Sequence, residues 1–345
     1  ITAVFGNCGG GMAVASAMSD FTFMEAKKAK LFVNAPNALA GNDGSKCDTA
    51  CAKFQSEEVG IVDVVAEEAE LIAQIRELVS MLPANNEDDL SYTDCEDDLN
   101  RVCADLEASA ADPAIALPMI SDEGIFFETK AEYGKDMVTG FIKLNGTTVG
   151  AVANRSTLYD EDGNAVEQFN AEMSARGCEK AAAFVKFCDA FNIPVLTLTN
   201  AASFKATKCT EKKIAKAAAA LTAAFAEADV PKVNVVTGKA FGSAYVTMNS
   251  KGLGADIVYA WPNAQIGMMD AKMAVKVMYP EADAKELREK AAAYAELQNS
   301  VASAAKRGYV DTVIDAQDTR KYVIGAFEML FTKREDRPGK KHGTV

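Results

Sequence analysis

Apolar and polar positions alternate most clearly between residues 233 and 267. A β-branched apolar run at 233–236 predicts a buried strand, which Gly238 closes. A helix pattern follows, opened by three small residues: Gly242, Ser243 and Ala244. Residues 256–260 and 264–267 predict two more strands. The first amides of a helix lack internal acceptors and carry the positive end of its dipole, so this turn predicts a site for a developing oxyanion.

The first 33 residues repeat this pattern. An apolar strand ends at Gly6, further glycines open an apolar helix, and Asp20 leads into another strand. Four pairs of positions superpose: Gly6 with Gly238, Gly10 with Gly242, Gly11 with Ser243 and, after a gap of a few residues, Asp20 with Asp256. We therefore interpret the chain as an internal duplication with one anion-stabilising turn in each copy. Because a much longer stretch precedes the turn in the second copy, we expect the first copy to lack its opening half and the sequence to be a fragment.

The remaining elements follow from periodicity and turn signals. Residues 68–81 follow the helical period and stop before Pro83. Asn145-Gly146, between apolar runs at 138–144 and 147–153, is a strong hairpin signal. A strand is expected at 194–199, and further helices at 178–191, 214–225, 282–299 and a last one with Val323, Ile324, Phe327, Leu330 and Phe331 on its core side. Strands that alternate with helices predict an α/β fold.

The composition changes between residues 85 and 122. This stretch is acidic and closes with Pro113 and Pro118. We place the domain boundary here, which predicts a first domain over residues 1–84, a linker over 85–122 and a second domain over 123–345. A solvated linker with a short helix explains the acidic run better than a metal or partner site does.

Composition and charge restrict the possible functions. The chain has 345 residues, 49% of them apolar, which is enough for two domains. Its net charge of −13 argues against nucleic acid and anionic membranes as direct partners. Eight cysteines form no CxxC motif and the single histidine, His342, is near the C-terminus, so we expect no metal. Such cysteines are typical of reduced core residues in a cytosolic protein, and no stretch resembles a signal peptide or membrane span.

Several stretches resemble a known family. The run ADIVYAWPNAQIG after a glycine-opened helix is similar to the crotonase superfamily. The longer run FAEADVPKVNVVTGKAFGSAYVTMNSKGLGADIVYAWPNAQIGMMDAK resembles one branch, the biotin-dependent acyl-CoA carboxyltransferases, and FGNCGGGMAVASAMSDFTFM resembles the first-domain motif of that branch. The resemblance spans nearly the whole chain. It implies an α/β fold of tandem crotonase-like (ClpP/crotonase) domains built from repeated ββα units, the first incomplete at its N-terminus.

The resemblance also implies a mechanism. Carboxybiotin and a short acyl-CoA, with propionyl-CoA/methylmalonyl-CoA as the favoured pair, would meet between the first domain of one subunit and the second domain of its partner. Gly10 and Gly11 would hold the thioester enolate, while the turn of residues 242–244 would hold the enolate-like oxygen of biotin. Biotin serves as the base after its carboxyl group leaves, so no acidic side chain is required.

Further positions border the implied site. Tyr245 and Val246 would contact the substrate, and Val246 matches a position that tunes acyl-chain preference, with ordinary helix packing as the equal alternative. Ala202, Ser203 and Phe204 replace the Pro-Gly-Phe element that many members carry on the biotin side. The lysines that follow are Lys205, Lys208, Lys212 and Lys213. They would contact CoA phosphates or a carrier protein, although a plain exposed basic face is the simpler interpretation.

The resemblance implies several partners. Biotin would arrive on a separate biotin carboxyl carrier protein, because Ala271-Lys272-Met273 resembles a biotinylation site only superficially. A biotin carboxylase subunit or membrane decarboxylase subunits would complete the complex, and the chain would form a dimer-based homo-oligomer, with a hexamer as one form. The expected location is the cytoplasm, peripheral to a membrane complex in the decarboxylase case.

Two other functions compete with carboxyl transfer. An acyl-CoA hydratase or isomerase of the crotonase type is one, but such enzymes place a glutamate just after the glycine triplet, where this chain has Met12, Ala13 and Val14. A non-catalytic scaffold subunit is the other. Hydration of crotonyl-CoA without biotin would favour the first, and assembly without carboxyl exchange would favour the second.

Overall fold

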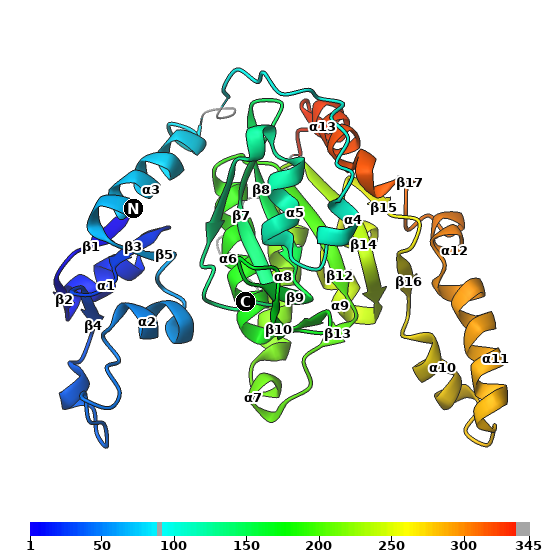
Figure 1. Ribbon diagram of the computed structural model, residues 1–345, viewed down its shortest axis with the longest axis horizontal. Coiled ribbons are helices and arrows are strands. Elements are labelled where there is room, and N and C mark those ends of the chain that lie inside the picture. Colours follow the sequence, from blue (N-terminus) through cyan, green and yellow to red (C-terminus); the bar gives the residue numbers. More distant parts are fainter. Residues whose placement is uncertain (88–91, 336–345) are drawn as a thin grey trace.

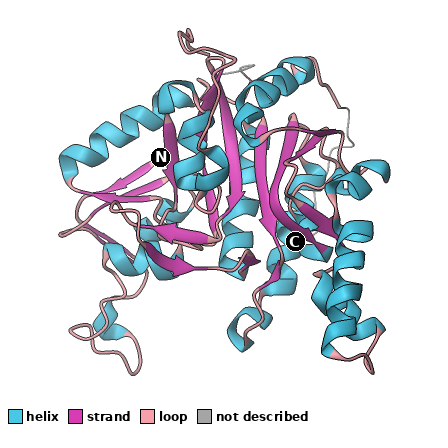
Figure 2. Ribbon diagram, turned by 45° about the vertical axis from the view of Figure 1, so that its right-hand side comes forward, coloured by secondary structure: helices cyan, strands magenta, loops and turns pink. Residues whose placement is uncertain are grey.

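A computed structural model gives the fold of residues 1–87 and 92–335, built around a mixed sheet (Figures 1 and 2). Among these residues the sheet has eight strands, in the order β17-β15-β14-β12-β8-β7-β6, with β16 paired to β14. The strands are Phe126–Thr129 (β6), Met137–Leu144 (β7), Thr147–Asn154 (β8), Val195–Ala201 (β12), Lys232–Phe241 (β14), Ile257–Ala260 (β15), Gln265–Gly267 (β16) and Thr312–Val313 (β17).

Helices cover both faces of this sheet. Apolar side chains of α6 (Ala175–Ala190) and α8 (Ile214–Glu227) form one core with it, and those of α5 (Pro113–Ile120) and α13 (Thr319–Leu330) form the other. Shorter elements connect them: α4 (Leu106–Ser109), η3 (Asp122–Gly124), β9 (Thr157–Tyr159), β10 (Ala165–Gln168), β11 (Glu172–Met173), β13 (Ser203–Phe204), α7 (Lys208–Glu211), α9 (Gly242–Thr247), η4 (Lys251–Leu253), α10 (Ala271–Met278), α11 (Ala284–Tyr294), η5 (Ala295–Asn299), α12 (Val301–Lys306) and η6 (Ala316–Asp318).

The predicted hairpin is present. Strands β7 and β8 pair antiparallel with Leu144 opposite Thr147. Asn145 and Gly146 both have positive φ, 50° and 75°, as a two-residue type I′ turn requires. From β8 onward the neighbouring strands of this sheet run parallel, so their carboxyl ends lie along one edge.

The first copy of the duplicated motif is smaller. Its strands form a three-stranded sheet in the order β1-β3-β5 and a separate pair, β2-β4. The elements are β1 (Thr2–Val4), β2 (Asn7–Gly9), α1 (Gly11–Ala17), β3 (Thr22–Glu25), β4 (Lys30–Phe32), η1 (Pro36–Ala38), α2 (Ala52–Phe54), η2 (Gln55–Val59), β5 (Val64–Ala66) and α3 (Glu68–Met81). The helix predicted over 68–81 therefore has the predicted bounds.

Strand register and side-chain contacts support the predicted duplication. Strand β1 pairs with β3, and β2 with β4, as β14 pairs with β15 and then β16. An aspartate precedes the third strand in each copy. The Asp63 carboxylate accepts from the Thr22 amide at 2.8 Å, and the Asp311 carboxylate accepts from the Val258 amide at the same distance. We call this aspartate-to-amide hydrogen bond the clamp and Asp63 and Asp311 the clamp aspartates. Because the clamp is present in both copies, their similarity extends well beyond the glycines.

The two copies share one hydrophobic core. The ring of Phe21, just before β3, lies 4.8 Å from that of Phe187 on α6 and 6.0 Å from that of Phe141 on β7. The Thr148 hydroxyl donates to the Met81 carbonyl at 2.6 Å, which ties the end of α3 to β8. Burial of this much apolar surface holds the first copy against the central sheet.

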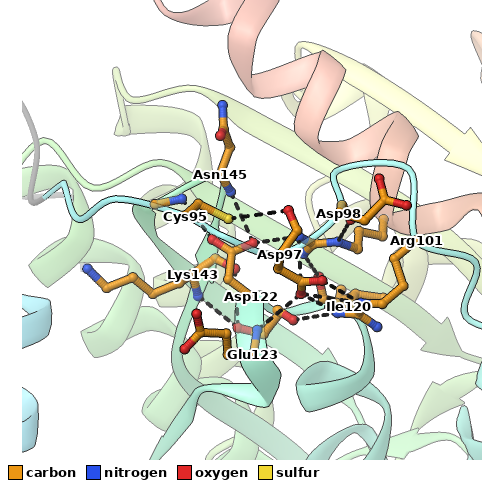
Figure 3. A network of polar contacts seen from close by, with 12 residues as sticks. Cys95, Asp97, Asp98, Arg101, Ile120, Asp122, Glu123, Lys143 and Asn145 are labelled. Atoms are coloured by element: carbon orange, nitrogen blue, oxygen red, sulfur yellow. Dashed lines mark hydrogen bonds and ion pairs between the residues drawn. The ribbon is translucent and has the colours of Figure 1, made fainter.

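The acidic segment 85–122 differs from the predicted solvated linker (Figure 3). Its described part contains α4 and α5, and Leu106, Leu117 and Ile120 are buried in the core beneath the sheet. The boundaries predicted at 84 and 122 stay predictions, but the second half of the segment packs as part of the second copy. Sequence reasoning missed this because the acidic residues mask a short apolar stripe.

Two arginines pair with the acidic run. Arg320 of α13 is fully buried and donates to the Asp122 carboxylate and to the Ile120 carbonyl, both at 2.7 Å. Asp122 in turn accepts from the Gly146 amide at 2.7 Å, so the hairpin turn and α13 are fixed to the segment. Arg101 binds Asp97 at 2.9 Å and lowers the pKa of that carboxyl to about 2. The acidic character is thus partly internal pairing rather than solvation.

Two smaller expectations need correction. Phe331 follows the end of α13 and is 58% exposed, so it does not lie on the core side as predicted. Cys103, Cys178 and Cys188 are buried as expected, but Cys47 and Cys209 are exposed. His342 lies outside the described residues. Within residues 1–87 and 92–335 no helix combines the length and apolarity that crossing a membrane requires.

Candidate active site

The first glycine turn joins β2 to α1. Gly10 has φ of 60°, a conformation that favours glycine, and its amide donates to the Phe32 carbonyl of β4 at 2.9 Å. The hydrogen bonds of the helix begin with the Ala13 amide, which donates to the Gly10 carbonyl at 3.1 Å. The amides of Gly11 and Met12 therefore precede the helical ladder. A Cβ at Gly10 or Gly11 would meet no heavy atom within 4 Å, so a ligand atom can approach the backbone.

The second glycine turn joins β14 to α9 with the same backbone. Gly242 has φ of 55°, and a Cβ there would lie 2.9 Å from the Met268 carbonyl oxygen. Ser243 is exposed and Ala244 is buried, so the opening of the helix faces outward while its next residue packs inward. Neither α1 nor α9 carries an acidic residue in its first turn. Both turns offer backbone amides and positive dipole ends without a nearby carboxylate on the same helix.

Two side chains of α9 have different environments. Val246 is 47% exposed, so packing within this chain does not account for it. Tyr245 is buried in a small apolar core, and burial raises its pKa to about 12, so the hydroxyl is neutral at ordinary pH. Contact of either residue with a substrate stays a prediction, but Val246 is the better placed of the two.

Residues 202–204 lie beside the second turn. Ser203 and Phe204 form β13, which pairs in parallel with β11 and contacts α9. The Ala202 amide donates to the Ala171 carbonyl at 2.8 Å, and Phe204 packs against the main core. The structure therefore places this segment beside α9, and its position on the biotin side stays a prediction.

The two turns lie apart within one chain. Helix α1 lies within the first copy at one side of the molecule, whereas α9 lies beyond α6 and α8 in the central unit (Figure 1). One chain on its own does not bring the amides of Gly11 and Ser243 onto one ligand.

Sequence reasoning missed the exposed apolar faces near the turns. Met12 on α1 is 68% exposed and Met18, directly after α1, is 83% exposed; on α10, Met273 is 64% and Val277 is 74% exposed. A helix that faces solvent is expected to have a polar face. The lack of polar residues on α1 and the methionines within 268–278 could therefore have indicated exposed apolar faces from the sequence. Within the part of the chain that the structure describes, no group of three or more His, Cys, Asp or Glu residues suits a metal ion.

Comparison with known proteins defines the family. The family model described as carboxyl transferase domain matches residues 1–345. The propionyl-CoA carboxylase carboxyltransferase subunit of Haloferax mediterranei is 35% identical, with 100% of this chain and 68% of the relative covered. Methylmalonyl-CoA decarboxylase subunit alpha of Propionigenium modestum is 34% identical over the same shares of the two chains.

A solved structure agrees with these sequence matches. The crystal structure of transcarboxylase 12S, with hydrolysed methylmalonyl-coenzyme A bound, superposes with a TM-score of 0.91 at 34% identity. The match covers 99% of this chain and 67% of the transcarboxylase 12S chain. The crotonase-type α/β fold expected from the sequence is therefore confirmed.

The fold and the matches together define the class: the chain belongs to the carboxyl transferase domain family, whose members are enzymes. Within it, the chain is a carboxyltransferase of the propionyl-CoA/methylmalonyl-CoA carboxylase or decarboxylase group, which confirms the family and activity that the sequence predicted.

Proposed function

We propose that this chain moves a carboxyl group between biotin and a short acyl-CoA, with propionyl-CoA/methylmalonyl-CoA as the substrate pair. The names of the relatives support this pair, since they include a propionyl-CoA carboxylase and a methylmalonyl-CoA decarboxylase. The observation that carries the proposal is the duplicated turn, in which Gly10 and Gly242 share a positive φ and open helices without an acidic first turn.

The first turn would hold the thioester. Its task is to stabilise negative charge on the thioester oxygen when the α-carbon loses a proton. The Gly10 amide, expected to act together with that of Gly11, is already paired with the Phe32 carbonyl. The amides of Gly11 and Met12 suit this task because they precede the helical ladder and the space around Gly10 and Gly11 is open.

The second turn would hold the ureido oxygen of biotin. When bound, carboxylated biotin supplies the carboxyl group, and its ring nitrogen then serves as the base. The amides at Ser243 and Ala244 would stabilise the charge on the ureido oxygen, and the absence of an acidic residue in the first turn of α9 fits a reaction without a protein acid.

Such a reaction needs both turns on one substrate pair, so the working site would form between two chains. The exposed apolar residues on α10 and on and directly after α1 support this, because such an assembly would cover them: Met12, Met18, Met273 and Val277. The expected assembly is a dimer-based homo-oligomer, and the related transcarboxylase 12S assembles as a hexamer.

Biotin would be carried by a separate carrier protein. Relatives are named as subunits, including the 12S subunit of methylmalonyl-CoA carboxyltransferase from Propionibacterium freudenreichii, which fits a chain that works within a larger complex. A biotin carboxylase subunit or membrane decarboxylase subunits would complete it, in the cytoplasm or at a membrane complex. Because carboxyl transfer is reversible, both directions are compatible with the same site.

The test is carboxyl exchange between free biotin and a panel of malonyl-type CoA thioesters. Carboxyl transfer from methylmalonyl-CoA to biotin, faster than from malonyl-CoA, is the expected result. Hydration of crotonyl-CoA without biotin would instead favour a hydratase, and intact assembly without any exchange would favour a scaffold.

A further inference from the structure

Five lysines gather between the end of β13 and the first turn of α8: Lys205, Lys208, Lys212, Lys213 and Lys216. All five are exposed, and we call them the lysine patch. The chain as a whole carries a net charge of −13, so this local positive charge runs against the overall balance. Glu211 lies among these lysines, so the segment carries a net excess of four positive charges, five minus one, which attracts partners of the opposite sign.

Part of the lysine patch lies at the positive end of a helix dipole, which is an unfavourable position for a cation. Helix α8 begins at Ile214, and its first turn contains no acidic residue. Lys212 and Lys213 therefore stand at the positive end of this helix dipole, where cations destabilise. The preceding α7 is fixed by the Thr207 hydroxyl, which accepts from the Thr210 amide at 3.1 Å. Helix formation alone does not account for lysines at these positions.

Ion pairs within the chain do not neutralise the patch. Other lysines of this protein have such partners, as Lys27 has Glu67 at 2.5 Å and Lys251 has Asp311 at 2.7 Å. Over residues 1–87 and 92–335, no carboxylate oxygen lies within 4.0 Å of an ammonium group of the lysine patch. The ammonium groups of the lysine patch therefore face solvent, where an external anion can reach them.

The patch borders the second turn. It follows directly on β13, and β13 contacts α9, whose first residues form that turn. Figure 1 shows α7 at the lower end of the central unit, next below β13 and α9, whereas α1 lies away on the first copy. An anion bound to the patch would therefore lie nearer to α9 than to α1 of the same chain.

We propose that the lysine patch docks an acidic surface of the biotin carrier domain as it delivers biotin to the second turn. The inference rests on the proposed function, which assigns biotin to this turn and the thioester to the other. A protein surface suits five spread cations better than one small anion does, because opposite charges distributed over an interface steer association and set orientation.

The experiment compares two charge-reversal variants with equal change in net charge. Lys208→Glu/Lys212→Glu alters the patch, and a glutamate at 212 suits the start of α8, so folding is retained. Lys186→Glu/Lys306→Glu alters exposed lysines on α6 and α12 as the control. Carboxyl transfer is measured with a carboxylated acidic carrier domain, with a carboxylated carrier domain of neutral surface, and with free carboxybiotin.

For the patch variant, KM for the acidic carrier is expected to rise about tenfold at low salt, with kcat little changed. The difference should shrink to about twofold at high salt, because salt screens exposed charges. KM for the acyl-CoA, the rates with free biotin and the control variant should match the parent. An unchanged carrier KM, or a raised KM for acyl-CoA alone, overturns the docking proposal. Absence of transfer to free biotin by the parent chain would instead contradict the proposed function itself.

Discussion

The two copies of the duplicated motif share the backbone conformation of the glycine turn but differ in the sheets and side chains that surround it. In the first copy, β1 and β2 are separate short strands in two small sheets, and a Cβ at Gly10 has open space. In the second, β14 is a single ten-residue strand inside the large sheet, and a Cβ at Gly242 meets the Met268 carbonyl at 2.9 Å. The positive φ persists in both surroundings, so packing alone does not explain it.

The helices that close the two copies are also held differently. Helix α3 uses buried apolar residues such as Leu71 and Leu78, whereas α13 adds the buried Arg320 with its carboxylate partner. The clamp aspartates differ too, since Asp63 is buried while the side chain of Asp311 is 39% exposed. The glycine turn and the strand register are the same in both copies, whereas the packing and ion pairs that stabilise them differ.

The largest expected effect is loss of activity on blocking either turn. Gly10→Val and Gly242→Val should each lower carboxyl transfer by at least ~10²–10³, the loss that removal of one oxyanion donor typically causes. Assembly should persist, but Gly242→Val should also be the less stable variant because of the Met268 contact. Exchange assays, gel filtration and thermal unfolding check this. Gly252→Val is the control, at an exposed glycine without close neighbours; full activity in either turn variant contradicts the account.

The next effect concerns the free energy of unfolding contributed by α3 and α13, the last helices of the two copies. Arg320→Met leaves the buried Asp122 without its cation and should lower the free energy of unfolding by about 3–5 kcal/mol. Arg76→Met, on the exposed side of α3, should change it by less than about 0.5 kcal/mol. Denaturant titration measures both. A loss below about 1 kcal/mol for Arg320→Met would show that α13 depends on apolar packing as α3 does.

The buried Asp63 of the first copy predicts an effect of pH on the free energy of unfolding. Burial raises the pKa of Asp63 to about 6, although Lys130 opposes the shift. Because the folded state keeps this proton to higher pH than the unfolded chain, the stability it contributes is present below about pH 4 and is lost as pH rises through about 6, by at most about 3 kcal/mol. Asp63→Asn should remove that slope in unfolding measured from pH 4 to 7. Asp311→Asn is the matched control, and an equal change in both variants would contradict the assignment to Asp63.

The smallest effect tests whether the exposed apolar faces meet in the oligomer. Met12→Glu or Met273→Glu should weaken association by about 1.5–3 kcal/mol, the value of burying a side chain of this size. Sedimentation at several concentrations measures the dissociation constant. Met329→Glu changes a similarly exposed methionine on α13 and serves as the control. If Met12→Glu and Met273→Glu both leave the dissociation constant unchanged, the interface between chains lies elsewhere.

Local signals predicted much of this fold. The Asn145-Gly146 hairpin, the helix at 68–81 and both glycine turns depend on neighbouring residues, so periodicity and glycine positions suffice to find them. The pairing of Arg320 with Asp122 joins positions far apart in the chain, and no local pattern announces it. The acidic composition of 85–122 therefore suggested a solvated linker where the structure has a packed segment.

The candidate site was predictable in its parts but not in its arrangement. Each turn could be found from its glycines, and the missing acidic residue after them separated carboxyl transfer from hydration. Their separation within one chain became visible only in three dimensions (Figure 1). The exposure of Val246 likewise required the fold, because a valine one turn into a helix is equally typical of a core.

The most direct test of a site shared between chains is complementation of two inactive variants. Gly10→Val and Gly242→Val subunits are dissociated, mixed in equal amounts and reassembled, and carboxyl transfer is measured against each variant alone. If the first turn of one chain works with the second turn of its partner, each mixed dimer holds one intact site, and about a quarter of the parent activity should return. If both turns act within one chain, mixing restores nothing, and that result would contradict the account.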